Sequence, residues 1–318
     1  MKRILLTRPL PDRVVEAARD LFEIEMREEN TPLKPGQMRG ALALYDGILP
    51  TLGDMFSVEV FAEAENCRCR ILSNFGVGYN HIDTAAARGV GIAVTNTPGA
   101  VTDATADIAM TLILMSARRA GEGERMLRAG RWSGWNPTQM LGLHVTGRTV
   151  GIIGMGRIGH AIARRCHFGF GMKVVYHNRS PKSVEFEARQ LETPEAVAAE
   201  ADFVVVAVPG GTETRHLIGQ GVFAAMKPTA HFINIARGDV VDEAALIAAL
   251  QSGRIAGAGL DVYEQEPLVP EALRALENVT LLPHLGTAAL EVREAMGLMA
   301  VDNLRAFFAG ETPPNLVN

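Results

Sequence analysis

A glycine-rich segment near the middle of the chain constrains the possible folds more than any other feature. An apolar run, Thr149–Ile153, leads directly into the pattern Gly154-x-Gly156-x-x-Gly159, and a helical pattern follows over residues 157–165. In such a unit the first glycine permits a tight turn, the second lets backbone amides approach a pyrophosphate, and the third lets the helix pack against the strand. The helix N-terminus adds partial positive charge for the phosphates. The segment predicts a dinucleotide-binding unit and not merely a turn, because another strand follows about 20 residues later.

Strand-like and helical patterns alternate over most of the 318 residues, which predicts parallel α/β architecture. A chain of this length exceeds the usual size of one hydrophobic core, so we expect two doubly wound, Rossmann-like domains. Composition alone leaves open whether the last helical pattern, residues 288–309, stays with the second domain or returns to the first. Strands are expected at residues 4–7, 44–49, 70–73 and 92–94, and again at 149–153, 173–176, 203–207, 231–235, 256–260 and 279–282.

The strand after the glycine-rich loop ends in residues that report on the cofactor. Asn178, Arg179 and Ser180 occupy the position where an NAD-specific site has an acidic residue for the ribose hydroxyls. A carboxylate there would repel a 2′-phosphate, whereas the planar guanidinium of Arg179 can pair with one. These residues favour NADP(H) over NAD(H), although a solvated surface arginine would leave the same pattern.

Three polar side chains, Arg237, Glu266 and His284, lie in segments that follow later apolar strands. In a doubly wound sheet such strand ends converge on the cofactor crevice. Reduction of a 2-oxo acid needs a cation for the carboxylate, a proton donor for the carbonyl oxygen and a group that orients this donor. Arg237, His284 and Glu266 suit these needs in turn, although the same residue types can also serve only to tie domains together.

With these residues the sequence resembles the D-isomer-specific 2-hydroxyacid dehydrogenase family over essentially its whole length, and within it the glyoxylate/hydroxypyruvate reductase branch. The specific segments, besides the glycine-rich loop, are Phe232–Gly238, Gly259–Pro267 and Pro283–Thr287. The resemblance implies an NAD(P)-dependent enzyme that reduces a small 2-oxo acid to the 2-hydroxy acid by hydride transfer.

The resemblance also implies roles for the three polar residues. Arg237 would clamp the substrate carboxylate and polarise its carbonyl. His284 would donate the proton in reduction and accept it in oxidation, and Glu266 would hydrogen-bond His284 and favour its protonated form.

The implied domain organisation is discontinuous, with a substrate domain at 1–100 plus 287–318 and an NAD(P)-binding domain at 101–286. The C-terminal helix would thus complete the N-terminal domain. In the substrate domain, backbone amides at Val77 and Gly78 would bind the carboxylate. Trp135 looks like part of a homodimer arm that reaches the partner subunit's site, and a core tryptophan is the competing interpretation. Further cofactor contacts are implied for Thr105, Met155, Arg157, Ile158, Val208, Pro209, Thr214, Ile235, Ala236, Asp261 and Gly286.

Composition narrows the class of protein further. The net charge of −5 gives no general attraction to nucleic acid or to an anionic membrane. We find no uncharged apolar stretch of the roughly 18–20 residues that a membrane span needs. The three cysteines lack the spacing of a redox motif or a zinc site, so we expect reduced thiols, no metal and a cytoplasmic protein.

Two alternatives stay open at this point. One is another D-2-hydroxyacid dehydrogenase, although a D-lactate type would usually place an acid at Asn178 and a formate type would have glutamine in place of Glu266. The other is a nucleotide-sensing corepressor that uses the fold as a binding module. The sequence leaves the preferred 2-oxo acid undetermined.

Overall fold

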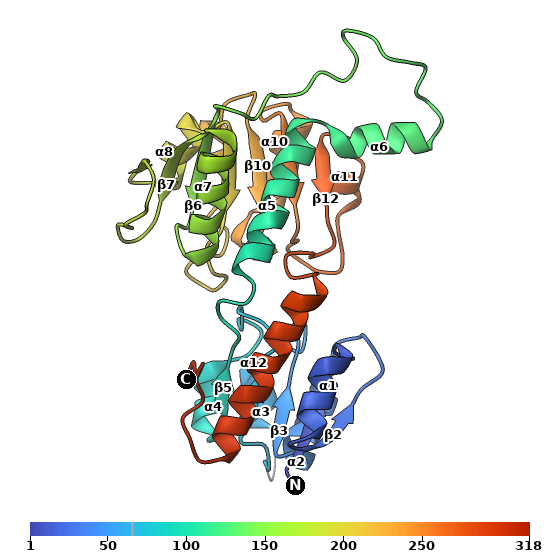
Figure 1. Ribbon diagram of the computed structural model, residues 1–318, viewed down its shortest axis with the longest axis vertical. Helices are drawn as coiled ribbons and strands as arrows, with labels where there is room; N and C mark the ends of the chain where they lie inside the picture. Colours follow the sequence, from blue (N-terminus) through green and yellow to red (C-terminus); the bar gives the residue numbers. More distant parts are fainter. Residues whose placement is uncertain (65–66) are drawn as a thin grey trace. The chain divides into compact units, whose positions relative to one another are not determined.

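The computed structural model describes residues 1–64 and 67–318, which divide into two compact units (Figure 1). One unit comprises Met1–Val101 and Ala288–Asn318, and the other comprises Thr102–Thr287. Each contains one parallel sheet covered by helices, so the predicted fold class is confirmed. In the part of the chain that the structure describes, no helix has the length and apolar character needed to cross a membrane.

The N-terminal unit is built on a five-stranded parallel sheet in the order β2-β1-β3-β4-β5. Side chains alternate between its two faces, as they must in a strand. Leu5 and Ile48 belong to the core under α2, α3 and α4, whereas Ile4 and Leu49 belong to the core under α1 and α12. The strands are β1 Arg3–Leu6, β2 Glu23–Met26, β3 Gly47–Leu49, β4 Ile71–Ser73 and β5 Ala93–Thr95, and the helices are α1 Asp12–Arg19, α2 Pro35–Leu44, α3 Val58–Ala62, α4 Thr84–Gly89 and α12 Leu290–Phe308.

The C-terminal helix α12 belongs to this unit, as the family resemblance implies. Ala300 and Leu304 are fully buried against residues of β1, β3 and β4. The hydroxyl of Ser73, at the end of β4, donates to the carbonyl oxygen of Ala300 at 2.8 Å. The returning helix therefore shares with α1 the task of covering one face of the N-terminal sheet, opposite α2, α3 and α4.

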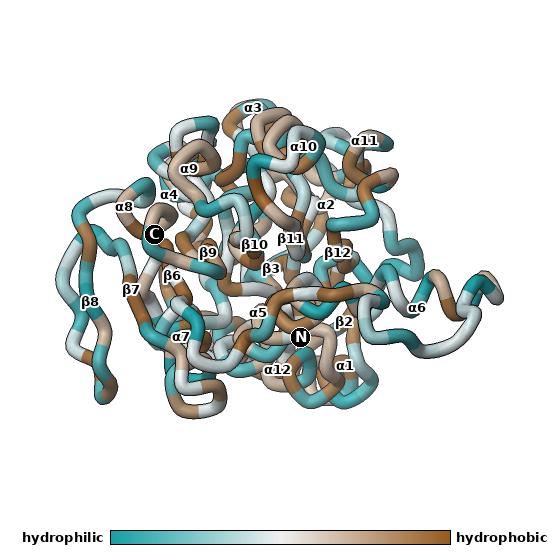
Figure 2. Tube along the Cα trace, turned by 90° about the horizontal axis from the view of Figure 1, so that it is seen from above, coloured by the Kyte–Doolittle hydropathy of each residue, from teal (hydrophilic) through white to brown (hydrophobic). Residues whose placement is uncertain are grey.

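The C-terminal unit contains a seven-stranded parallel sheet in the order β12-β11-β10-β9-β6-β7-β8. One face is covered by α8, α9 and α10 and the other by α5 and α7, the doubly wound arrangement. The central strand β9 is wholly apolar and buried (Figure 2). The strands are β6 Thr149–Ile153, β7 Lys173–His177, β8 Ala188–Gln190, β9 Phe203–Val206, β10 His231–Asn234, β11 Gly257–Leu260 and β12 Val279–Leu281, and the helices are α5 Thr102–Ala117, α6 Ala120–Arg128, α7 Arg157–Phe170, α8 Pro194–Glu200, α9 Gln220–Ala225, α10 Glu243–Gln251 and α11 Glu271–Arg274, with a 3₁₀ turn at Gly238–Val240.

The sequence patterns err mainly at the edges of the sheets. They miss β2 and β8, because both are short edge strands that carry charged or amide side chains and lack a continuous apolar run. The prediction of a strand over residues 44–49 is wrong for the first half of that range. Leu44 is the last residue of α2, and only Gly47–Leu49 pairs in the sheet.

The segment after α6 leaves the body of the C-terminal unit (Figure 1). Helix α6 has no buried residue, and the side chains that follow are also exposed, with Trp135 at 80%. The interpretation of Trp135 as a core tryptophan is therefore wrong.

Candidate active site

The loop between β6 and α7 has the backbone geometry that its glycines predict. Gly154 has a φ of +102°, and a Cβ atom there would lie 2.8 Å from the backbone of Ala207. A Cβ atom on Gly159 would lie 2.0 Å from the carbonyl oxygen of Gly154, so only glycine lets α7 begin this close to the strand. At Gly156, by contrast, a Cβ atom would meet nothing within 4 Å.

The open space beside Gly156 adjoins the N-terminus of α7. Gly156 is the N-cap of this helix, and no side chain caps it. The first amides of a helix have no acceptor within the helix and carry partial positive charge. The backbone at Gly156, Arg157 and Ile158 therefore fits a pyrophosphate, and a nicotinamide dinucleotide fits the residues present.

Asn178 is anchored directly to this loop. Its Oδ1 atom accepts from the amide of Met155 at 3.1 Å, and its Nδ2 atom donates to the carbonyl oxygen of Ser180 at 2.8 Å. Arg179 extends into solvent and forms an ion pair with Glu213, Nη1 to Oε2, at 3.0 Å. The three residues that the sequence assigns to the ribose end thus follow β7 beside the glycine-rich loop.

Two further strand ends lie on the other side of the glycine-rich loop, that of β9 next to β6 and that of β10 one strand further along the sheet. After β9, Val208 and Pro209 enter a turn in which the hydroxyl of Thr214 donates to the carbonyl oxygen of Pro209 at 2.8 Å. After β10, Ile235 and Ala236 are buried. The structure therefore places all five residues at the carboxyl edge of the sheet, on neighbouring strands.

His284 and Glu266 form the central contact of the site. Their Nδ1 and Oε2 atoms are 2.8 Å apart, and each side chain is 29% exposed. His284 has a φ of +55°, in the left-handed region that non-glycine residues seldom adopt. Such conformations persist only where the surroundings impose them, and they gather at functional sites.

Asp261, at the end of β11, is the group that imposes this conformation. Its carboxylate accepts from the amides of Leu285 at 2.6 Å and Gly286 at 2.8 Å, and its carbonyl oxygen accepts from the amide of His284 at 3.0 Å. On the other side of this turn, the hydroxyl of Thr105 in α5 donates to the carbonyl oxygen of Gly286 at 3.2 Å. Asp261 thus holds the backbone of the turn that carries the imidazole.

Arg237 follows β10 and approaches the same pair. Its Nη1 atom donates to the carbonyl oxygen of Ala236 at 2.7 Å, while its Nε atom is buried and has no hydrogen-bond partner among the described residues. The β10 and β11 loops touch here, since a Cβ atom on Gly238 would lie 1.8 Å from the backbone of Tyr263. The amide of Tyr263 in turn donates to Glu266 at 3.1 Å. Buried donors are almost always paired in proteins, so the unpaired Nε atom of Arg237 sets this guanidinium apart.

The charges of the site depend on one another. Burial would raise the pKa of Glu266, but the hydrogen bond and charge of His284, the amide of Tyr263 and the charge of Arg237 together lower it below its ordinary value. Burial lowers the pKa of Arg237, and the charges of Glu266 and Asp239 oppose that shift. The carboxylate of Glu266 is therefore ionised near neutral pH.

The predicted substrate loop lies at the carboxyl edge of the N-terminal sheet. The Nδ2 atom of Asn74 donates to the carbonyl oxygens of Gly76 and Gly78, each at 3.0 Å, and the Nδ2 atom of Asn96 donates to that of Val77 at 2.9 Å. Side chains of the protein thus hold this loop by its carbonyl groups, which is compatible with amides that serve a ligand.

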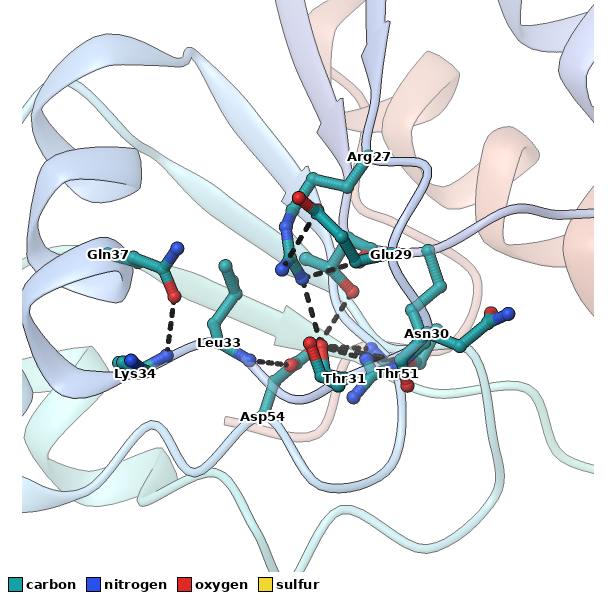
Figure 3. Close-up of polar contacts among 11 residues, drawn as sticks. Arg27, Glu29, Asn30, Thr31, Leu33, Lys34, Gln37, Thr51 and Asp54 are labelled. Carbon is teal, nitrogen blue, oxygen red and sulfur yellow. Dashed lines mark hydrogen bonds and ion pairs between the residues drawn. The ribbon is translucent and has the colours of Figure 1, made fainter.

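A buried carboxylate organises the neighbouring loops of the same edge (Figure 3). Asp54, with no exposed surface, pairs with Arg8 at 3.0 Å and accepts from the Thr7 hydroxyl at 2.6 Å. It also accepts from the amides of Leu33 at 2.9 Å and Thr51 at 3.1 Å. Three chain segments therefore meet on one side chain.

This network is continuous with the substrate loop. The amide of Phe75 donates to the carbonyl oxygen of Pro50 at 2.9 Å, immediately before Thr51. Asp54 therefore positions a loop that is hydrogen-bonded to the segment carrying Val77 and Gly78.

Trp135 does not join the other site residues within its own unit. Helix α6, which precedes it, is tied by Arg125 to Glu277, just before β12 begins. This is the amino edge of the sheet, opposite the edge that carries His284.

The strand order, the phosphate loop and the Arg–Glu–His cluster define a nicotinamide-dependent dehydrogenase, and comparisons with known proteins support this class. Residues 110–286 match the D-isomer specific 2-hydroxyacid dehydrogenase, NAD binding domain. A glyoxylate reductase of Thermococcus gammatolerans is 44% identical over 322 residues, which cover 99% of this chain and 96% of the relative.

Solved structures agree over the whole chain. A protein from Thermus thermophilus superposes with a TM-score of 0.92 at 40% identity, covering 99% of this chain and 100% of the other. An NADPH-dependent glyoxylate/hydroxypyruvate reductase from Sinorhizobium meliloti, in complex with NADP and malonate, superposes with a TM-score of 0.88 at 39% identity, covering 99% and 96% of the two chains. The chain belongs to the D-isomer-specific 2-hydroxyacid dehydrogenase family and is an NAD(P)-dependent enzyme that reduces 2-oxo acids.

Three features of the site could not be predicted from the sequence. The Arg179–Glu213 pair, the backbone role of Asp261 and the Asp54 network all join segments that are distant along the chain. The only local signal is an acidic residue directly after an apolar strand, which identifies Asp261 as a strand-end residue but not its contacts.

Proposed function

We propose that the protein reduces a small 2-oxo acid of the glyoxylate or hydroxypyruvate type with NADPH, and that His284 donates the proton. The proposal rests on one juxtaposition, an imidazole held by a carboxylate at 2.8 Å beside a guanidinium with an unused buried donor. Glyoxylate reductases that match this chain over nearly its whole length support the substrate class.

Each residue of the cluster has a distinct task in this proposal. When bound, the nicotinamide supplies a hydride to the carbonyl carbon of the substrate. Arg237 attracts the carboxylate and polarises the adjacent carbonyl, because its charge is partly desolvated and so acts strongly. The Nε2 atom of His284, the ring nitrogen that does not contact Glu266, transfers a proton to the carbonyl oxygen. Glu266 stabilises the charged ring before the transfer, and the amides of Val77 and Gly78 are the proposed additional carboxylate ligands.

The preference for NADPH is proposed from the segment after β7. Asn178 supplies no repulsive carboxylate and is held by the glycine-rich loop. Arg179 supplies a planar cation and Ser180 a hydroxyl for the 2′-phosphate. The solved structure of the Sinorhizobium meliloti reductase is a complex with NADP and malonate, which supports this assignment.

A panel of 2-oxo acids with NADPH or NADH as reductant tests the proposal. We expect oxidation of NADPH with glyoxylate or hydroxypyruvate. The catalytic efficiency with NADPH should be roughly ten- to a hundredfold above that with NADH, because this ratio corresponds to the free energy of one charge-assisted hydrogen bond. The double change Asn178→Asp with Arg179→Ala should reverse the order. No turnover with any 2-oxo acid would refute the assigned activity, and equal use of NADH would refute only the cofactor preference.

A homodimer is also proposed, because the segment around the exposed Trp135 and helix α6 leaves the body of its unit. Light scattering at assay concentration should report two chains. A monomer that turns over normally would remove the role of Trp135 in a partner's site.

A further inference from the structure

The ion pair between Arg179 and Glu213 spans the strand that leads into the phosphate loop. Arg179 follows β7, and Glu213 lies in the turn after β9. Strand β6 lies between these two strands in the sheet. The Nη1 to Oε2 contact, at 3.0 Å, therefore passes over the carboxyl end of β6, where the glycine-rich loop begins.

The backbone segments that carry Arg179 and Glu213 are each held by a hydrogen bond, whereas the two side chains are free to pair with other groups. On one side, the Nε2 atom of Gln190 donates to the carbonyl oxygen of Asn178 at 2.8 Å. On the other side, the amide of Thr214 donates to the carbonyl oxygen of Gly211 at 3.1 Å. The side chains of Arg179 and Glu213 are 84% and 82% exposed, so no packing holds them in place.

We infer that Glu213 moderates the discrimination between NADPH and NADH by competing with the cofactor's 2′-phosphate for Arg179. The inference rests on the proposed role of Arg179 in NADPH binding. A phosphate that pairs with the guanidinium must displace the Glu213 carboxylate, and the displaced carboxylate stays on a fixed turn near the new anion. Both effects oppose NADPH. NADH has no 2′-phosphate, so the pair can persist when NADH binds, and Glu213 leaves its affinity unchanged.

The size of the effect follows from the exposure of the pair. Ion pairs between solvated side chains contribute little, and salt screens them further. Removing the Glu213 charge should therefore strengthen NADPH binding by about two- to fivefold at low salt. The gain should shrink as ionic strength rises.

The test is a fluorescence titration of the full chain with NADPH and with NADH, at low and at high salt, for Glu213→Gln. A matched control is Glu200→Gln, which removes an equally charged residue from an exposed ion pair with Arg189 in the same unit. We expect a lower Kd for NADPH in Glu213→Gln alone, and an unchanged Kd for NADH in both variants. An unchanged or a higher Kd for NADPH in Glu213→Gln would overturn the inference, since a higher value would mean that Glu213 orients Arg179 for the phosphate.

Arg179→Gln separates this inference from the cofactor proposal. If Arg179→Gln weakens NADPH relative to NADH, the proposed role of Arg179 stands whatever Glu213→Gln does. In the Arg179→Gln background, competition is absent, so the further change Glu213→Gln should give a smaller gain than in the parent. An equal gain in both backgrounds would contradict competition.

Discussion

The carboxyl edges of the two sheets each carry an arginine near a carboxylate, but the two arrangements differ in how completely their polar atoms are satisfied. Asp54 has no exposed surface, and it accepts from Thr7, Arg8 and two backbone amides. Arg237, in the other sheet, has a buried Nε atom with no partner in the described chain, near a Glu266 side chain that is 29% exposed.

The difference distinguishes a structural network from the site proposed to bind the substrate. Buried polar groups in proteins are almost always paired, so the saturated carboxylate of Asp54 needs nothing more. An unpaired buried donor beside the partly exposed imidazole destabilises the free protein, and in our proposal the substrate anion satisfies it. The same residue types thus serve stability in one unit and, in our proposal, chemistry in the other.

The largest effect should come from His284→Ala. Loss of a general acid typically lowers turnover by about 100-fold or more. NADPH binding and thermal stability should stay near the parent values, because the imidazole is partly exposed. Steady-state kinetics with a fluorescence titration of NADPH would measure both. His144→Ala, which removes an exposed histidine from the same unit, is the control, and normal turnover in His284→Ala would exclude the assigned role.

Asp54→Asn should differ from His284→Ala, because its main effect is on stability and only a smaller effect on turnover is expected, through the loop next to Val77 and Gly78. Asparagine keeps the shape but removes the charge opposite Arg8, and its amide group cannot accept the bonds of the lost oxygen. We expect a loss of roughly 1.5–3 kcal/mol in the free energy of unfolding, the value of a hydrogen bond to a charged group. Urea denaturation followed by circular dichroism measures this loss. Asp20→Asn, an exposed change in the same unit, should leave the midpoint unchanged, and an unchanged midpoint for Asp54→Asn would show that the network is dispensable.

A comparison of His284 with Asp54 also shows which features of the molecule can be predicted from the sequence. His284 and Gly154 lie in local patterns in which strand, turn and residue type occur together, so the fold and the reactive cluster can be predicted from short segments. Asp54 cannot, because its partner Thr7 is 47 residues away and Thr7 has no distinctive neighbours. The left-handed backbone of His284 is equally hidden, since Asp261 imposes it through tertiary contacts.

Arg237→Lys should have a smaller effect and tests whether the unpaired guanidinium is a substrate clamp. A lysine keeps the charge but loses the planar fork that matches a carboxylate. We expect the KM for the 2-oxo acid to rise about tenfold, with a smaller change in turnover. Initial rates over a range of substrate concentrations provide both constants. If neither changes, the unused donor of Arg237 has a structural explanation.

The smallest effect, a shift in pH dependence, concerns Glu266→Gln. The hydrogen bond and the charge of His284 are among the interactions that lower the pKa of Glu266. In the proposed mechanism the Glu266 carboxylate in turn stabilises the protonated ring. Reduction requires the protonated ring and fails as pH rises and the ring loses its proton. A neutral glutamine stabilises the charged ring less, so the alkaline fall in rate should move to lower pH. The shift should be about one pH unit or less, because water screens the partly exposed pair. Glu264→Gln is the matched control, since Glu264 contacts His216 at 2.9 Å and lies two positions away. An alkaline limb that stays in place in Glu266→Gln would mean that Glu266 only orients the ring, as Asp54 orients its loops.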